Sequence, residues 1–145
     1  MKKGFTLIEL LAVIVILALL ATIAVPSAIA ISTSIKKNLY CEKVDMLLID
    51  AERWGDEHSS RLSEDCYYEI KVEDLVEQGI TKKENDTKGS YIINPVTNEA
   101  MDKNVIGIYL KNKRATAFYV ETNSELIDAC DKVVVSDRPT TKCNG

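Results

Sequence analysis

The sequence has few of the residues from which catalytic and metal sites are usually built. It contains one histidine, His58, no Cys-X-X-Cys pair and no glycine-rich phosphate-binding loop. A zinc site of ordinary Cys and His spacing is therefore not expected, and neither is a phosphate cradle. His58 precedes Ser59 and Ser60, but residues adjacent in sequence rarely place a base against a nucleophile. We predict no catalytic residues, no metal and no cofactor, and hence a protein that is not an enzyme.

The sequence also lacks an excess of positive charge. Its 18 Lys and Arg residues are outnumbered by 22 Asp and Glu residues, and the formal net charge is −4. Proteins bind nucleic acids largely through Lys and Arg contacts to the phosphates. No nucleic acid partner is therefore expected.

Charge is missing altogether from one long stretch near the N-terminus. No charged residue lies between Glu9 and Lys36. A helix rises about 1.5 Å per residue and needs about 20 apolar residues to cross the core of a bilayer. We therefore predict a transmembrane helix over residues 5–31. Glu9 is unusual there because a carboxylate inside such a segment is costly, which marks it as a functional residue.

The residues that open the apolar stretch form a recognisable motif. They are Lys2-Lys3-Gly4-Phe5-Thr6-Leu7-Ile8-Glu9, and they resemble the class III leader of type IV pilins and pseudopilins. The resemblance implies that a prepilin peptidase cuts after Gly4, removes the leader of residues 1–4 and methylates the new N-terminal Phe5. Two plainer interpretations are a secretory signal peptide cut near Ala30 and a simple membrane anchor.

The same resemblance implies the partners of the protein and its location. The subunit is expected to sit in the cell membrane as a single-pass protein, and to meet a pilus assembly platform driven by an ATPase motor. It would then polymerise with copies of itself into an extracellular filament for adhesion, motility or biofilm formation. Pseudopilins of type II secretion or competence DNA-uptake machines share this leader, as do minor pilins, so these remain alternatives.

The resemblance also assigns assembly roles to Thr6, Glu9 and Pro26. After cleavage, Phe5 carries a positive α-amino group one helical turn from Glu9, and a buried carboxylate needs such a cation. Glu9 can reach its own N-terminus or that of a neighbouring subunit, and the family favours the neighbour. Pro26 removes the hydrogen bond to the carbonyl of Thr22, so we expect a kink or a loosened turn there.

Four cysteines, Cys41, Cys66, Cys130 and Cys143, all follow the apolar stretch. An even number of cysteines beyond a membrane anchor indicates two disulfide bonds formed in an oxidising compartment. Four cysteines allow three pairings. We favour Cys41–Cys66 with Cys130–Cys143, which would tie the helix to the loop beside it and hold the C-terminal end.

Residues 32–145 are predicted to form one globular domain. The long helix is expected to continue to about Gly55, a residue that often ends helices. Its second half is amphipathic, with charged residues on a solvated back. Its apolar stripe consists of Tyr40, Val44, Leu47, Ala51 and Trp54, widened by Leu39 and Met46.

Strand patterns follow the helix. They cover residues 105–110 and 115–120, joined by a turn at Asn112-Lys113, with shorter strands at 67–72 and 132–136. Residues 73–79 are predicted to form a short helix capped by Gly79. Because the strands follow one another without crossover helices, they should form a small antiparallel sheet covered by the long helix. The predicted fold class is α+β, which is also the pilin fold that the resemblance implies.

Overall fold

The fold is taken from a computed structural model, which describes residues 4–120, 130 and 137–144. The side chains of residues 24–27 lie outside this description. The chain divides into two compact units, residues 1–36 and residues 37–145. Helix α1, Leu7–Glu57, contributes to both units.

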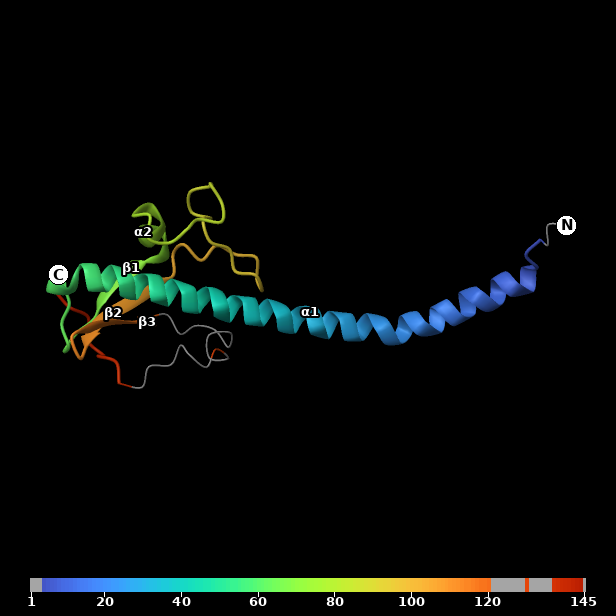
Figure 1. The fold of residues 1–145 in the computed structure, drawn as a ribbon, viewed down its shortest axis with the longest axis horizontal. Coiled ribbons are helices and arrows are strands. Elements are labelled where there is room, and N and C mark those ends of the chain that lie inside the picture. Colours follow the sequence, from blue (N-terminus) through green and yellow to red (C-terminus); the bar gives the residue numbers. More distant parts are fainter. Residues whose placement is uncertain (1–3, 121–129, 131–136, 145) are drawn as a thin grey trace. The chain divides into compact units, whose positions relative to one another are not determined.

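Helix α1 is 51 residues long and forms one continuous ribbon in Figure 1. In the first unit its large apolar side chains are exposed, from Phe5 just before the helix to Ile35. Leu and Ala in this run favour a helix, and the run leaves no polar side to face water. By length and composition alone, the helix is able to cross a membrane.

The second half of α1 lies at the centre of the globular unit. Tyr40, Val44, Leu47, Ala51 and Trp54 are all buried in its hydrophobic core. Their spacing of three and four residues places them on one side of the helix. The predicted apolar stripe is therefore confirmed.

The prediction that Leu39 and Met46 widen this stripe is wrong. Their side chains are 47% and 42% exposed, and Leu48 is buried instead. Each residue turns the helix by about 100°. Leu39 and Met46 precede Tyr40 and Leu47 and turn toward solvent, whereas Leu48 follows Leu47 on the covered side.

Three strands form an antiparallel sheet in the order β1-β2-β3. Strand β1 is Tyr68–Lys71, β2 is Val105–Lys111 and β3 is Arg114–Tyr119. Asn112 and Lys113 join β2 to β3 with φ angles of 53° and 66°. Two successive left-handed residues indicate a tight type I′ turn, which confirms the predicted hairpin. The strand predicted at 132–136 lies outside the described residues.

Two short helices connect these elements. A 3₁₀ helix, Ser59–Arg61, follows α1, and helix α2, Val72–Glu77, follows β1. Gly79 has a φ of 73°, and its N–H donates to the carbonyl of Val76 at 3.0 Å. The predicted helix with a glycine cap is therefore confirmed, with its start one residue earlier than expected.

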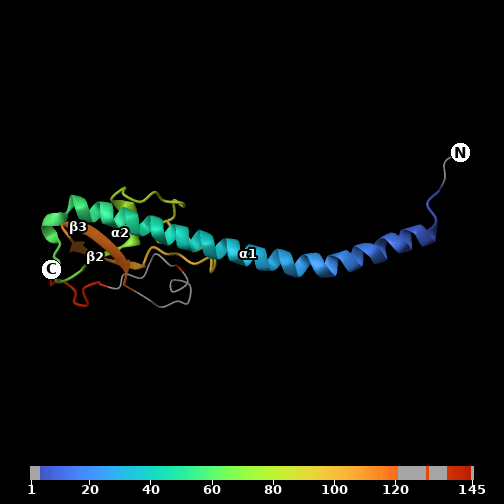
Figure 2. The ribbon, with the colours of Figure 1, turned by 60° about the horizontal axis from the view of Figure 1, so that its bottom comes forward.

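The sheet has two differently covered faces. Figure 2 shows the strands lying against the C-terminal half of α1. On the opposite face the ring of Phe118 lies over Gly107, where an added Cβ would come within 2.5 Å of the ring. The ring of Tyr67 meets Phe118 edge-on at 5.2 Å, and the guanidinium of Arg138 lies 4.9 Å from its centre. Aromatic and cation–π contacts thus pack this second face.

The charged side of α1 is not the purely solvated face that the sequence predicted. Lys43 Nζ lies 2.7 Å from Glu84 Oε1 and donates to the carbonyl of Ile93 at 2.6 Å. Asp50 Oδ2 accepts a hydrogen bond from the hydroxyl of Thr81 at 2.8 Å. These contacts fasten the loop after α2 to the helix. The prediction is wrong because a charge pattern on a helix does not show which loops fold back onto it.

Helix α1 ends at Glu57, two residues beyond the predicted end at about Gly55, so Gly55 lies within the helix and does not terminate it. A Cβ added at Gly55 would lie 2.6 Å from Ala115 Cβ and 2.8 Å from Ile108 Cγ2. These distances are too short for any side chain without movement of the sheet. Glycine is needed here for close contact between helix and sheet, not for ending the helix.

The disulfides join Cys41 to Cys130 and Cys66 to Cys143, with Cα–Cα distances of 5.4 and 5.0 Å. The prediction of two disulfides is confirmed. The predicted pairing, Cys41–Cys66 with Cys130–Cys143, is wrong. Each observed bond instead ties a cysteine near the helix–sheet core to one in the last part of the chain.

The length of α1 explains why the predicted pairing fails. The rings of Trp54 and Tyr68 stack at 5.6 Å, so the chain near Cys66 lies beside the last turns of α1. The helix rises about 20 Å between Cys41 and Trp54. A disulfide spans at most about 7 Å between Cα atoms, so Cys66 is out of reach of Cys41.

Cys143 reaches Cys66 because the C-terminal tail pairs with the backbone before β1. Tyr67 N–H donates to the carbonyl of Thr141 at 3.0 Å, and Cys143 N–H donates to the carbonyl of Tyr67 at 2.8 Å. These bonds bring the two cysteines side by side.

We expect Gly55→Ala to lower the free energy of unfolding by about 1–2 kcal/mol, because overpacking outweighs the better helix propensity of alanine. Denaturant unfolding followed by Trp54 fluorescence measures the change. Asn38→Ala, at an exposed position of the same helix, is the control and should be neutral or slightly stabilising. A Gly55→Ala protein as stable as Asn38→Ala would contradict the close helix–sheet contact.

We expect non-reducing peptide mapping to recover the Cys41–Cys130 and Cys66–Cys143 peptides. Cys41→Ser with Cys130→Ser should lower stability by about 2–4 kcal/mol and leave the second disulfide intact. Cys41→Ser with Cys66→Ser crosses the two bonds and should leave free thiols at Cys130 and Cys143. A disulfide between Cys130 and Cys143 in the crossed variant would show that the observed pairing is not fixed by the fold.

Candidate processing and assembly site

The candidate site begins just before α1. Gly4, Phe5 and Thr6 precede the helix, which starts at Leu7. The side chain of Phe5 is 79% exposed. A Cβ added to Gly4 would meet no atom within 4 Å. The peptide bond between Gly4 and Phe5 therefore lies on an open stretch of chain that another protein can reach.

Thr6 and Glu9 form a reciprocal cap on the first turn of α1. Thr6 N–H and Thr6 Oγ1 donate to Glu9 Oε2 at 3.0 and 2.9 Å, and Glu9 N–H donates to Thr6 Oγ1 at 3.3 Å. The first N–H groups of a helix have no partner within it, and this capping box satisfies two donors at once. It also fixes the carboxylate of Glu9 toward the N-terminal end of the helix.

The capping role of Thr6 and Glu9 was not predicted, although the sequence contains its signal. Thr-X-X-Glu directly before an apolar run is the sequence form of a capping box. The predicted partner of Glu9 was the amino group of Phe5, which exists only after cleavage. In the structure that amino group is still joined to Gly4, and Glu9 bonds to Thr6. The pairing in the cleaved chain stays a prediction.

Pro26 lies within α1, whose backbone is helical on both sides of it. Its side chain lies outside the described part of the chain, so the predicted loosening stays a prediction. One turn earlier, the hydroxyl of Thr22 donates to the carbonyl of Leu19 at 2.7 Å. Such a bond back to the preceding turn often accompanies a bend in a helix.

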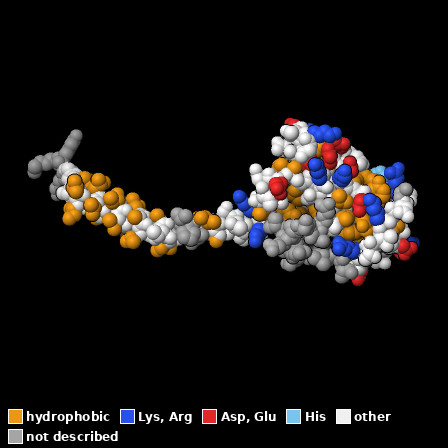
Figure 3. All heavy atoms as spheres, turned by 180° about the vertical axis from the view of Figure 1, so that it is seen from behind, with side chains coloured by type: hydrophobic (Ala, Val, Ile, Leu, Met, Phe, Trp, Pro, Cys, Tyr) orange, Lys and Arg blue, Asp and Glu red, His pale blue; other side chains and the backbone are white. Residues whose placement is uncertain are grey.

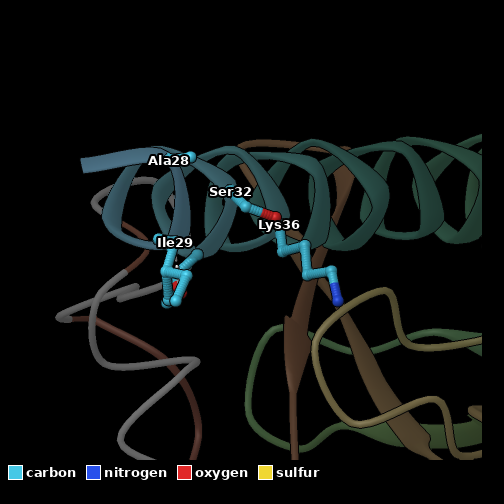
Figure 4. Close-up of a pocket in the computed structure, with 5 residues that line it drawn as sticks. Ala28, Ile29, Ser32 and Lys36 are labelled. Atoms are coloured by element: carbon cyan, nitrogen blue, oxygen red, sulfur yellow. Dashed lines mark hydrogen bonds between the residues drawn. The ribbon is translucent and has the colours of Figure 1, made fainter. Parts of the chain in front are cut away.

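The apolar surface of the first unit is the second part of the site. Figure 3 shows hydrophobic side chains along this part of α1. Figure 4 shows a shallow, open hollow beside the helix, lined by Ala28, Ile29, Ser32, Thr33 and Lys36. The hydroxyl of Thr33 is already bonded to the carbonyl of Ile29 at 3.0 Å. Among the residues that line this hollow, Lys36 is the one cation, and none is an acid that could pair with it.

Two buried polar side chains of the globular unit, Asp102 and Tyr119, form hydrogen bonds within its core. Asp102 is fully buried, and its carboxylate accepts the N–H groups of Tyr91 and Ile92 at 2.8 and 2.9 Å. Burial raises the pKa of the Tyr119 phenol, whose oxygen accepts a hydrogen bond from Asn104 Nδ2 at 3.5 Å. Among the described residues, no three His, Cys, Asp or Glu side chains gather as a metal site would require.

Comparison with known proteins concerns the N-terminal part of the site, around Gly4 and Glu9. No curated protein and no solved structure matches the chain. Residues 1–25 match the family described as the prokaryotic N-terminal methylation motif. This match covers Gly4, Phe5, Thr6 and Glu9 together with the first turns of α1. The chain therefore carries the class III leader of the type IV pilins and pseudopilins, as its sequence predicted.

Proposed function

We propose that this chain is the structural subunit of a type IV pilus. It is made as a prepilin anchored in the cell membrane, cut after Gly4, methylated at Phe5 and polymerised through α1 into a surface filament. The observation that carries the proposal is the methylation motif at residues 1–25, which includes the first turns of α1 and their exposed apolar side chains.

Gly4 supports the processing step. An added Cβ would meet open space at this residue, and its φ does not lie in the left-handed region that favours glycine. The fold of the chain itself therefore gives no reason for glycine here. A peptidase that must bring its catalytic groups close to the backbone supplies such a reason. On this proposal the chain consists of a leader at 1–4, a membrane and assembly helix at 5–31 and a globular domain at 32–145.

The apolar surface of α1 supports the assembly step. Large apolar side chains such as Leu10, Ile16 and Leu20 are more than half exposed, and water is an unfavourable surrounding for them. Lipid covers this surface before assembly, and the helices of neighbouring copies cover it within a filament. The apolar side chains stay covered when the helix moves from lipid into a filament. Packing and polar contacts between helices therefore determine whether the filament is favoured.

The globular unit supports an exposed structural role. Two disulfides close the domain, which stabilises a small core outside the reducing cytosol. The buried carboxylate of Asp102 and the phenol of Tyr119 take part in hydrogen bonds within the core. We therefore propose a structural subunit that works with a prepilin peptidase, an assembly platform and an ATPase motor, and not an enzyme.

Glu9 has a defined part in this proposal. In the prepilin its carboxylate is held by Thr6. Cleavage after Gly4 creates a positive amino group on Phe5, next to Thr6. Glu9 then either bonds to this group in its own chain or reaches the amino group of a neighbour in the filament. The second pairing joins two copies and sets their relative position along the filament.

The test compares Glu9→Val with Glu9→Gln, each as the only copy of the gene. Both variants should insert in the membrane and lose residues 1–4, because Gly4 is unchanged. Gln keeps an oxygen that can accept the N–H of Thr6, but it lacks the charge. If the ion pair drives assembly, the yield of surface filaments should fall about tenfold or more in both variants.

Two outcomes would count against this role. A normal filament yield from Glu9→Val would show that the residue has no part in assembly. A normal yield from Glu9→Gln together with loss in Glu9→Val would show that the helix cap matters and the charge does not.

A further inference from the structure

Among the strands that the structure describes, β3 forms one of the two outer edges of the sheet. The open edge of a sheet presents unpaired backbone groups on which a strand of another molecule can pair. In an antiparallel pair, successive residues point their backbone groups alternately toward the partner strand and away from it. The N–H groups of Ala115 and Ala117 point away from β2, since both bond to α1.

Two carboxylates of α1 occupy this edge. Ala115 N–H donates to Asp56 Oδ1 at 2.9 Å, and Ala117 N–H donates to Glu52 Oε1 at 3.2 Å. Residues four apart on a helix are about 6 Å apart along its axis. Alternate residues of a strand are about 6.8 Å apart. Glu52 and Asp56 therefore match the spacing of two successive outward N–H groups.

Other parts of the chain bond to one further residue at each edge. The carbonyl of Tyr119, at the end of β3, accepts a hydrogen bond from Arg138 Nη1 at 3.3 Å. At the other edge of the sheet, Tyr67, the residue just before β1, exchanges backbone hydrogen bonds with Thr141 and Cys143 of the C-terminal tail. Both edges are thus met by groups of the same molecule.

We propose that Glu52 and Asp56 block the edge of β3, so that a second copy of this chain cannot pair with it strand to strand. A charged acceptor holds an N–H group more strongly than a neutral one, and charged side chains directed at an edge oppose the approach of another strand. The proposal does not depend on the proposed function. Its consequence is that copies of the chain associate through other surfaces, with their sheets kept separate.

The test uses the full chain in detergent micelles, which cover the apolar part of α1. Glu52→Ala with Asp56→Ala removes both acceptors. Glu52→Gln with Asp56→Asn keeps an acceptor oxygen on each side chain and is the matched control. In the alanine pair, hydrogen exchange at the N–H groups of Ala115 and Ala117 should quicken about tenfold or more. In the control, the exchange rates of these two N–H groups should stay closer to those of the unsubstituted chain.

The second measurement is association through strands. With rising protein concentration, the alanine pair should form aggregates that sediment and show the infrared band of intermolecular β-structure, whereas the control should not. Unchanged exchange at Ala115 and Ala117, or an alanine pair that stays as dispersed as the unsubstituted chain, would overturn the proposal.

Single variants decide the matter if the alanine pair does not fold. Asp56→Ala should quicken exchange mainly at Ala115, and Glu52→Ala mainly at Ala117, with Trp54 fluorescence unchanged. Equal quickening at both N–H groups in either single variant would indicate general loosening of the domain. That result would contradict separate acceptor roles for the two carboxylates.

Discussion

The exposed apolar surface of the first half of α1 is the constraint on which the rest of the molecule depends. Among the side chains that the structure describes from Phe5 to Ile35, sixteen large apolar ones are exposed. Burial of one such side chain contributes about 1.5–3 kcal/mol, so their sum is on the order of tens of kcal/mol, more than the roughly 5–15 kcal/mol that stabilises a domain. This half of the helix must therefore be covered by lipid or by other protein chains. The methylation motif at residues 1–25 suits a membrane anchor that later assembles into a filament.

The second half of the same helix meets the opposite requirement, because it must stay soluble while it organises a domain. One side buries the stripe that ends at Trp54 against the sheet, and Gly55 permits close contact with β2 and β3. On its charged sides, Lys43 bonds to the loop after α2. Glu52 and Asp56 accept hydrogen bonds from the edge of β3. The helix is thus the frame of the domain. The Cys41–Cys130 disulfide attaches a later part of the chain to that frame, and Cys66–Cys143 attaches the C-terminal tail next to β1.

Local patterns predicted the parts of this structure that depend on neighbours in sequence. The apolar stripe, the Asn112-Lys113 hairpin and the leader each extend over a few turns or residues. Features that depend on distant segments were not predictable in this way. The cysteine pairing follows from the length of α1, the need for Gly55 follows from the sheet beside it, and the role of Glu52 follows from the edge of β3. The Thr6–Glu9 cap was local and could have been recognised.

The most direct test of the account is the mass of the subunit in filaments sheared from the cell surface. The account predicts an abundant chain that begins at Phe5, carries one methyl group on its α-nitrogen and retains both disulfides. Fragmentation of the N-terminal peptide would place the methyl group. A chain beginning after Ala30, or its absence from sheared filaments while it is abundant in the membrane, would contradict a pilus subunit.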